Sequence, residues 1–238
     1  MSIAENLAEV RSRIGEAARR TGRPASEITL VAVSKTFGVD RVREAFAAGQ
    51  REFGENKVQE GLAKVEATAD IALRWHLIGH VQSNKAKKAA TSFACIQSVD
   101  SVDLLQRIDA AAAARTTGPA GAALLEVMVQ VDFAGEATKF GAPPDEAERI
   151  VGAALEARAV RLIGLMMLPP WNEDPEQTRP WFVRARQFRD RLVAGGVPRE
   201  ALHHLSMGMS HDYEAAIEEG STIVRVGTAI FGKRQVVR

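Results

Sequence analysis

The feature that most constrains the fold is a regular alternation of short apolar segments with longer amphipathic ones. Eight segments have the length and β-branched content of buried strands: residues 28–34, 51–54, 73–79, 93–99, 122–131, 160–167, 201–206 and 222–227. Between them, apolar residues recur at helical spacing, and several of these stretches end in glycine. Strands separated by helices pair in parallel through right-handed crossovers, so the sequence predicts an α/β protein.

Eight strand–helix units predict a closed (β/α)8 TIM barrel that residues 1–238 form as a single domain. An extra amphipathic helix precedes the first strand, in a position to cap the lower end of the barrel, where the strands begin. A doubly wound open sheet is the alternative. That fold usually has a Gly-rich nucleotide-binding turn after its first strand, whereas this chain has "SKTFG" at residues 34–38.

Composition excludes several classes of partner. The formal net charge is +1, so the chain has no overall field to attract nucleic acid or an anionic membrane. Its single cysteine, Cys95, excludes an internal disulfide and indicates the reducing cytoplasm. Apolar runs fall short of the roughly 18–20 residues that span a bilayer. We therefore expect a cytoplasmic protein without nucleic-acid or membrane partners, and a monomer.

Lys35 ends the first predicted strand, "LVAVSKT", where a charged group meets an apolar segment. One interpretation is an aliphatic stem whose ammonium reaches water beside Glu55. The functional interpretation is a partly desolvated amine that attacks a carbonyl and forms a Schiff base. The choice between them depends on what binds nearby.

Two neighbouring loops have the composition of a phosphate site. In "SMGMSHDYEAAI", Gly208 permits close approach of the backbone to a ligand, and Ser210 is predicted to be the N-cap of a helix that begins at His211. After the last strand, Gly227 and Thr228 add a second glycine–hydroxyl pair. Phosphate sites after strands seven and eight recur in TIM barrels, so two such loops together favour phosphate binding.

Arg225 supplies a third element, on the last predicted strand and on the same face as Ile223 and Gly227. A buried arginine needs an acceptor, either a carboxylate or a ring nitrogen. A lysine for an aldehyde, a helix N-terminus for a phosphate and an arginine for a ring nitrogen together describe pyridoxal 5′-phosphate (PLP).

Five blocks of the sequence closely resemble the YggS/PROSC family of PLP homeostasis proteins: "VAVSKT", "FGENKVQE", "WHLIGHVQSNK", "SVDS" and "LSMGMSHDYEAAIEEGSTIVRVGTAIFG". They follow in order over essentially the whole chain. The resemblance implies a single PLP-binding barrel of fold type III, like the N-terminal domain of bacterial alanine racemases.

The resemblance also implies a role for each matching residue. Lys35 would be the Schiff-base lysine, Arg225 would face the pyridine nitrogen, and Asn56 would lie close to the ring. The residues that would hold or line the phosphate are Ser206, Met209, Ser210, Gly227 and Thr228. Departures from the family's usual residues occur at Asp132, Met167 and His211, outside these proposed contacts.

The resemblance favours a protein that binds PLP and buffers it or delivers it to PLP-dependent apo-enzymes, with no efficient catalysis of its own. The alternative is a PLP-dependent amino-acid racemase. The related racemases add a β-rich domain and a catalytic tyrosine from the partner subunit, for which this chain is too short. Tyr213, the single tyrosine, is predicted to lie beside the phosphate loop rather than opposite Lys35. A Schiff-base aldolase without a cofactor is disfavoured because it leaves Arg225 unexplained.

Two further features have weaker implications. His76 and His80 are four residues apart, but Gly79 and the strand pattern disfavour a two-histidine metal site, so no metal is predicted. Three lysines in "NKAKKAA" suggest a solvated helix face, with a weak phosphate or partner patch as the alternative: Lys85, Lys87 and Lys88.

Overall fold

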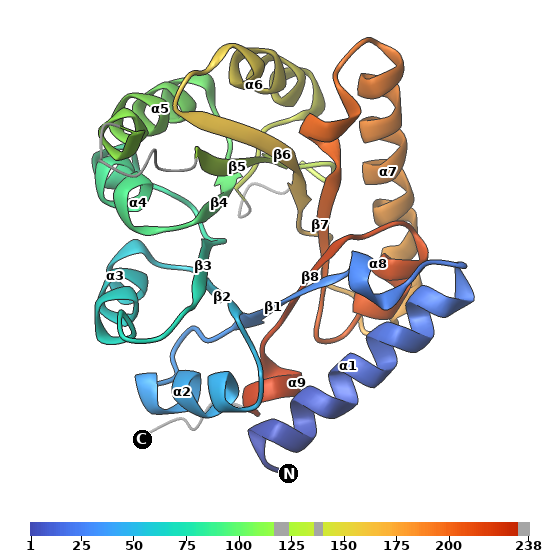
Figure 1. The fold of residues 1–238 in the computed structure, drawn as a ribbon. Coiled ribbons are helices and arrows are strands. Elements are labelled where there is room, and N and C mark those ends of the chain that lie inside the picture. The colour runs from blue at the N-terminus through green and yellow to red at the C-terminus, as the bar shows by residue number, and fades with distance from the viewer. Residues whose placement is uncertain (117–123, 136–139, 233–238) are drawn as a thin grey trace.

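The computed structural model describes residues 1–116, 124–135 and 140–232. Within these residues, eight parallel strands form a closed barrel in chain order (Figure 1). The strands are β1 (Thr29–Val33), β2 (Glu52–Glu55), β3 (Arg74–Leu77), β4 (Cys95–Val99), β5 (Leu125–Val131), β6 (Val160–Met167), β7 (His204–Met209) and β8 (Ile223–Val226). Pairing of β8 with β1 closes the barrel and sets Arg225 opposite Val31. The predicted (β/α)8 barrel is confirmed.

Helices surround the barrel as an outer layer (Figure 1). They are α1 (Ile3–Arg20), α2 (Val39–Ala47), α3 (Val58–Ala67), α4 (Ala86–Ser92), α5 (Val102–Thr116), α6 (Pro144–Glu156), α7 (Arg179–Ala194), α8 (Tyr213–Glu218) and α9 (Thr228–Phe231). Short 3₁₀ turns are η1 (Ala25–Glu27), η2 (Ser83–Lys85), η3 (Pro175–Thr178) and η4 (Arg199–Leu202). None of the described helices is both long enough and apolar enough to cross a membrane.

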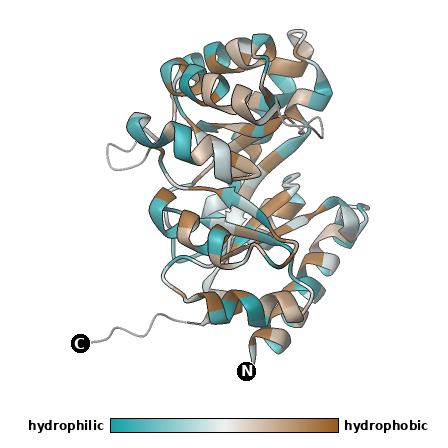
Figure 2. Ribbon diagram, turned by 60° about the vertical axis from the view of Figure 1, so that its left-hand side comes forward, coloured by the Kyte–Doolittle hydropathy of each residue, from teal (hydrophilic) through white to brown (hydrophobic). Residues whose placement is uncertain are grey.

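The apolar core has two parts, because each strand has one face toward the helices and one toward the barrel axis. The larger part fills the layer between strands and helices. Figure 2 shows hydrophobic and hydrophilic residues interleaved along the same outer helices, as expected of helices with one buried side. A smaller apolar cluster has these buried members: Val31, Cys95, Met128, Ile163, Met166 and Ile223. Burial raises the pKa of the Cys95 thiol, which suits a packing residue.

Helix α1 does not cap the lower end of the barrel, contrary to the prediction. It packs beside α2, α8 and α9 in the outer layer (Figure 1). Its buried stripe consists of Ile3, Leu7, Val10, Ile14, Ala17 and Ala18. The strand starts at the lower end carry charged side chains instead, Glu52, Arg74, Glu126 and Arg161. An apolar helix face is more stable against other helices than over this charged surface.

Strand β7 begins later than predicted. The sequence places a strand over 201–206, whereas Ala201 and Leu202 belong to the 3₁₀ turn η4 and β7 runs from His204 to Met209. Both turn residues are buried, so their apolar character arises from packing outside the sheet. As a result, most of "SMGMS" lies within β7 rather than after it.

Candidate functional site

Lys35 lies in the turn between β1 and α2, two residues beyond the end of β1, and its side chain is partly buried. The next residue, Thr36, has φ of 70°, in the left-handed region that β-branched residues rarely adopt. Strain of this kind costs about 1–3 kcal/mol and persists where the surroundings impose it. The backbone that presents Lys35 is therefore held in place by its neighbours.

Helix α3 contacts the backbone immediately before Lys35. Lys64 Nζ lies 2.5 Å from Glu55 Oε1 and donates to the Ser34 carbonyl oxygen at 2.7 Å. The Ser34 hydroxyl donates to the same Glu55 oxygen at 2.6 Å. Glu60, also on α3, has a carboxyl pKa lowered chiefly by its hydrogen bond to Lys57, and the backbone of Thr36 contributes in the same direction. The residue before Lys35 is thus held to α3 by Lys64 and its buried ion pair.

Arg225 is buried, with 3% of its surface exposed, at the carboxyl-terminal half of β8. Its Nη1 donates to the Ser206 hydroxyl at 2.5 Å, and its Nη2 donates to the Met167 carbonyl oxygen at 2.9 Å. Burial lowers the pKa of the guanidinium to about 10, while the charge of Asp212 acts in the opposite direction. Arg225 therefore remains a cation at neutral pH, and both of these hydrogen-bond acceptors are uncharged.

Ser210 does not cap a helix that begins at His211, contrary to the prediction. Helix α8 begins at Tyr213, and its N-cap is Asp212. The Ser210 hydroxyl instead accepts hydrogen bonds from the backbone amides of Gly227 and Ala229, at 3.1 and 3.3 Å. Residues 210–212 form the turn after β7, so the chain is not yet helical there. Ser210 thereby connects the loop after β7 to the start of α9, where Gly227 and Thr228 lie.

Gly208 allows α8 to pack closely on β7. Its φ is +95°, and a Cβ atom at this position would lie 2.6 Å from the Ala216 Cβ and 2.9 Å from the Tyr213 Cα. The following loop is held by Asp212, whose Oδ1 accepts from the Met209 amide at 2.7 Å. Burial raises the pKa of the Asp212 carboxyl. Both the backbone conformation and the close packing of α8 therefore require glycine at this position.

Asn56 follows β2 and lines a cavity of about 320 Å³ with Lys57, Gln59, His80, Gln82 and Lys85. His80 is held by Asp100, with Nδ1 to Oδ2 at 3.1 Å. Of the three lysines in "NKAKKAA", Lys85 lies on this cavity, whereas Lys87 and Lys88 are exposed on α4.

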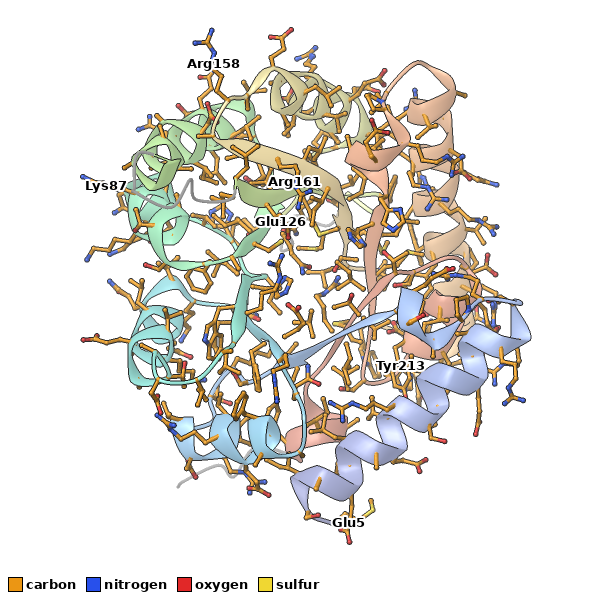
Figure 3. The ribbon with its side chains drawn as sticks, viewed as in Figure 1. Glu5, Lys87, Glu126, Arg158, Arg161 and Tyr213 are labelled. Atoms are coloured by element: carbon orange, nitrogen blue, oxygen red, sulfur yellow. The ribbon has the colours of Figure 1, made fainter. Side chains whose placement is uncertain are left out.

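Tyr213 lies in the first turn of α8 and is buried near α1 (Figure 3). The Arg13 guanidinium carbon lies 5.7 Å from its ring centroid. Burial raises the pKa of its phenol. Tyr213 is therefore part of the contact between α1 and α8.

The barrel brings most of the predicted residues to the end where the strands finish. Lys35, Asn56 and Arg225 come from the adjacent segments β1, β2 and β8, and Ser210 contacts Gly227 directly. Ser206 is separate from that pair, because its buried hydroxyl contacts Arg225. Sequence reasoning missed Lys64, although a lysine on the buried face of a helix, with Val58 and Gly61, is an available signal.

Comparison with known proteins shows that this barrel belongs to the same fold class as the N-terminal domain of alanine racemase. The family model for the N-terminal domain of alanine racemase matches residues 5–235. Alanine racemase from E. faecalis has a TM-score of 0.66 at 15% identity, covering 98% of this chain and 59% of that protein. At that identity the likeness concerns the fold alone.

Closer relatives define the family. A pyridoxal phosphate homeostasis protein of Aquifex aeolicus is 41% identical, covering 99% of this chain and 100% of its own length. The corresponding protein of Pseudomonas aeruginosa is 43% identical, covering 98% of this chain and 96% of its own. The structure of PipY from Synechococcus elongatus with PLP bound has a TM-score of 0.83 at 38% identity, covering 97% of this chain and 100% of PipY. This chain belongs to the family of pyridoxal phosphate homeostasis proteins.

Proposed function

We propose that this protein binds PLP and serves PLP homeostasis by buffering the cofactor or delivering it, with Lys35 as the covalent anchor. The PLP-bound structure of PipY and the names of the curated relatives support this function. Bound PLP would supply an aldehyde and an electron-withdrawing pyridine ring. The residues of this chain would bind that molecule and fix its orientation.

The observation that carries the proposal is the state of Arg225. Its guanidinium is buried, and two of its five N–H groups donate to uncharged acceptors, Ser206 and Met167. A ring nitrogen is a suitable further acceptor, since it accepts a hydrogen bond without requiring a second buried charge. Arg225 would then orient the ring by donating a hydrogen bond to the nitrogen. Because the guanidinium stays charged, it acts only as a donor and does not exchange a proton with the nitrogen.

The remaining predicted residues fit the other parts of the molecule. Lys35 lies in the turn that follows β1, and β1 pairs with β8, the strand that contains Arg225. This proximity supports the role of Lys35 as the amine that holds the aldehyde. Met209 ends β7, and the next residue, Ser210, contacts Gly227, which precedes Thr228. These residues would surround the phosphate. Asn56 would lie close to the ring from β2.

We also propose that the protein has no efficient amino-acid chemistry. A two-base proton exchange, as in the related racemases, needs a base on each side of the substrate. Tyr213 is buried against α1 with a raised pKa, so it is not available as the second base. A single domain over residues 1–238, a monomeric state, a cytoplasmic location and transfer to apo-enzymes stay predictions from the sequence.

Lys35→Ala tests the anchor. We expect the wild-type protein incubated with PLP and then borohydride to carry a stable adduct on Lys35, located by mass spectrometry. The variant should lose this adduct and remain folded, because Lys35 lies in a surface turn and not in the packed core. An adduct on another lysine of the wild type, or one that persists in the variant, refutes the assignment.

A second experiment tests the absence of catalysis. The PLP-loaded protein is incubated with a panel of L-amino acids, and chirality, keto-acid formation and α-proton exchange are followed. We expect turnover far below the median enzyme rate of about 10 per second. Turnover near that rate for any amino acid would favour the racemase alternative.

A further inference from the structure

A row of polar side chains crosses the inside of the barrel. Glu52 Oε2 lies 2.6 Å from His76 Nε2, and His76 Nδ1 lies 3.0 Å from Gln97 Nε2. Gln97 Oε1 lies 2.6 Å from the Ser206 hydroxyl, which lies 2.5 Å from Arg225 Nη1. These residues belong to β2, β3, β4, β7 and β8, so contacts across the barrel assemble the row.

The four inner members of this row are buried. His76 and Arg225 are each 3% exposed, and Gln97 and Ser206 are fully buried. A buried polar group without a hydrogen-bond partner costs about 1–3 kcal/mol, so each member depends on its neighbours. Such a row is stable when every donor meets an acceptor.

The two ends impose one direction on every hydrogen bond. Arginine has no acceptor, so the Ser206 oxygen accepts from Arg225 and its hydrogen must point to Gln97. Gln97 then presents Oε1 to Ser206 and Nε2 to His76. His76 accepts at Nδ1 and has its proton on Nε2, from which it donates to the Glu52 carboxylate.

The carboxylate end is anchored at the lower face of the barrel. Arg74 contacts both Glu52, at 3.4 Å, and Glu126. Arg161 lies 2.5 Å from Glu126, and Figure 3 shows both residues near the centre of the barrel in this view. The exposed fraction of the side chain falls from 61% for Arg161 to 27% for Glu52 and 4% for His76. The row therefore begins in a charged cluster at the surface and ends at Arg225.

We propose that Glu52, His76 and Gln97 are positioning residues that hold Arg225 for an aromatic ring nitrogen. This inference rests on the proposed function, because it concerns how the same site recognises its ligand. With its hydrogen committed to Gln97, Ser206 offers Arg225 a lone pair. The Nη1 contact and the Met167 carbonyl then fix the guanidinium plane, and its remaining N–H groups can face the ligand. The row thus selects a ring that accepts a hydrogen bond at this position.

The test compares two ligands that differ at one atom. Dissociation constants are measured for PLP and for 1-deazapyridoxal 5′-phosphate, in which C–H replaces the ring nitrogen. We expect the wild type to prefer PLP about 10-fold or more, the usual range for a hydrogen bond to a charged donor. Gln97→Leu and Glu52→Gln should each reduce this preference at least about 3-fold. Gln130→Leu is the matched control, since Gln130 is also buried in a strand but donates to the Phe140 carbonyl.

The outcomes separate the inference from the proposed function. If the wild type shows no preference, or Arg225→Met retains it, the ring-nitrogen contact is wrong and the proposed binding mode fails. If Arg225→Met abolishes the preference while Gln97→Leu and Glu52→Gln retain it, only the positioning role is overturned. An equal loss of affinity for both ligands also overturns it, because that is the result of a general structural defect.

A measurement on the ligand-free wild type keeps the inference testable if the variants do not fold. Nitrogen-15 chemical shifts distinguish the two tautomers of a neutral imidazole. The expected result is a His76 ring with its proton on Nε2. A proton on Nδ1 would reverse the direction of the row and refute the inference.

Discussion

Lys64→Met tests how the turn that carries Lys35 is held. The Lys64 side chain is 9% exposed and the Glu55 side chain is fully buried, with 2.5 Å between Nζ and Oε1. The second Glu55 oxygen, Oε2, is buried without a hydrogen-bond partner among the described residues. Methionine matches the lysine stem in length but removes the charge, so the carboxylate stays in the interior with the Ser34 hydroxyl as its remaining hydrogen-bond donor among the described residues.

The expected cost is about 3–5 kcal/mol, the usual result of removing one member of a buried ion pair. For a chain of this size, 1 kcal/mol shifts the melting temperature by about 2–4 °C, so we expect a decrease of about 6–20 °C. Thermal and urea unfolding of the ligand-free protein, followed by circular dichroism, measure the change. Borohydride trapping of PLP at Lys35 should also slow, because the Ser34 carbonyl loses its contact with α3 and the backbone before Lys35 is held less firmly.

Two further variants make this prediction specific. Lys57→Met is the matched control, since Lys57 pairs with Glu60 at 2.9 Å but is 74% exposed, and should cost less than about 1 kcal/mol. Adding Glu55→Met to Lys64→Met should recover much of the loss, because both charges then leave the interior. If Lys64→Met costs no more than Lys57→Met, the ion pair does not hold the turn.

Two other predictions concern the phosphate loop and acid stability. Ser210→Ala combined with Thr228→Ala should weaken PLP binding more than pyridoxal binding, by about 1.5–3 kcal/mol for each lost hydrogen bond to the phosphate. Equal weakening of the two ligands in a titration would place the phosphate elsewhere. For acid stability, burial lowers the pKa of His204 from 6.5 to about 4, with a further contribution from His203. The unfolded chain therefore binds more protons between these pH values, so the stabilising contribution is complete above about pH 6.5 and is lost as the pH falls toward 4. Urea midpoints measured across this range should decrease less in His204→Gln than in the wild type, and parallel curves would contradict the prediction.

The amino-acid sequence determined the architecture by its periodicity. A single short apolar strand cannot bury its own side chains, and each intervening helix has one apolar side that must be covered. Parallel strands covered by helices bury both kinds of apolar surface. The positions of Lys35 just after β1 and of Arg225 near the end of β8 also follow from the sequence, because the apolar runs that mark these two strands are local. This local pattern, with the resemblance to a known family, was sufficient to indicate PLP.

The tertiary structure decided which polar residues meet. Strand periodicity predicts which side chains point inward, but not which ones face each other across the barrel, since that depends on how the strands are staggered when the sheet closes. Ser206 and Gln97 are separated by 109 positions in the chain and are joined by this closure. The same reason explains why the sequence did not predict the contacts of Ser210. Its hydrogen-bond partners are backbone amides of the next strand–helix unit. Contacts of this kind arise from the closed barrel, because no local segment contains both partners.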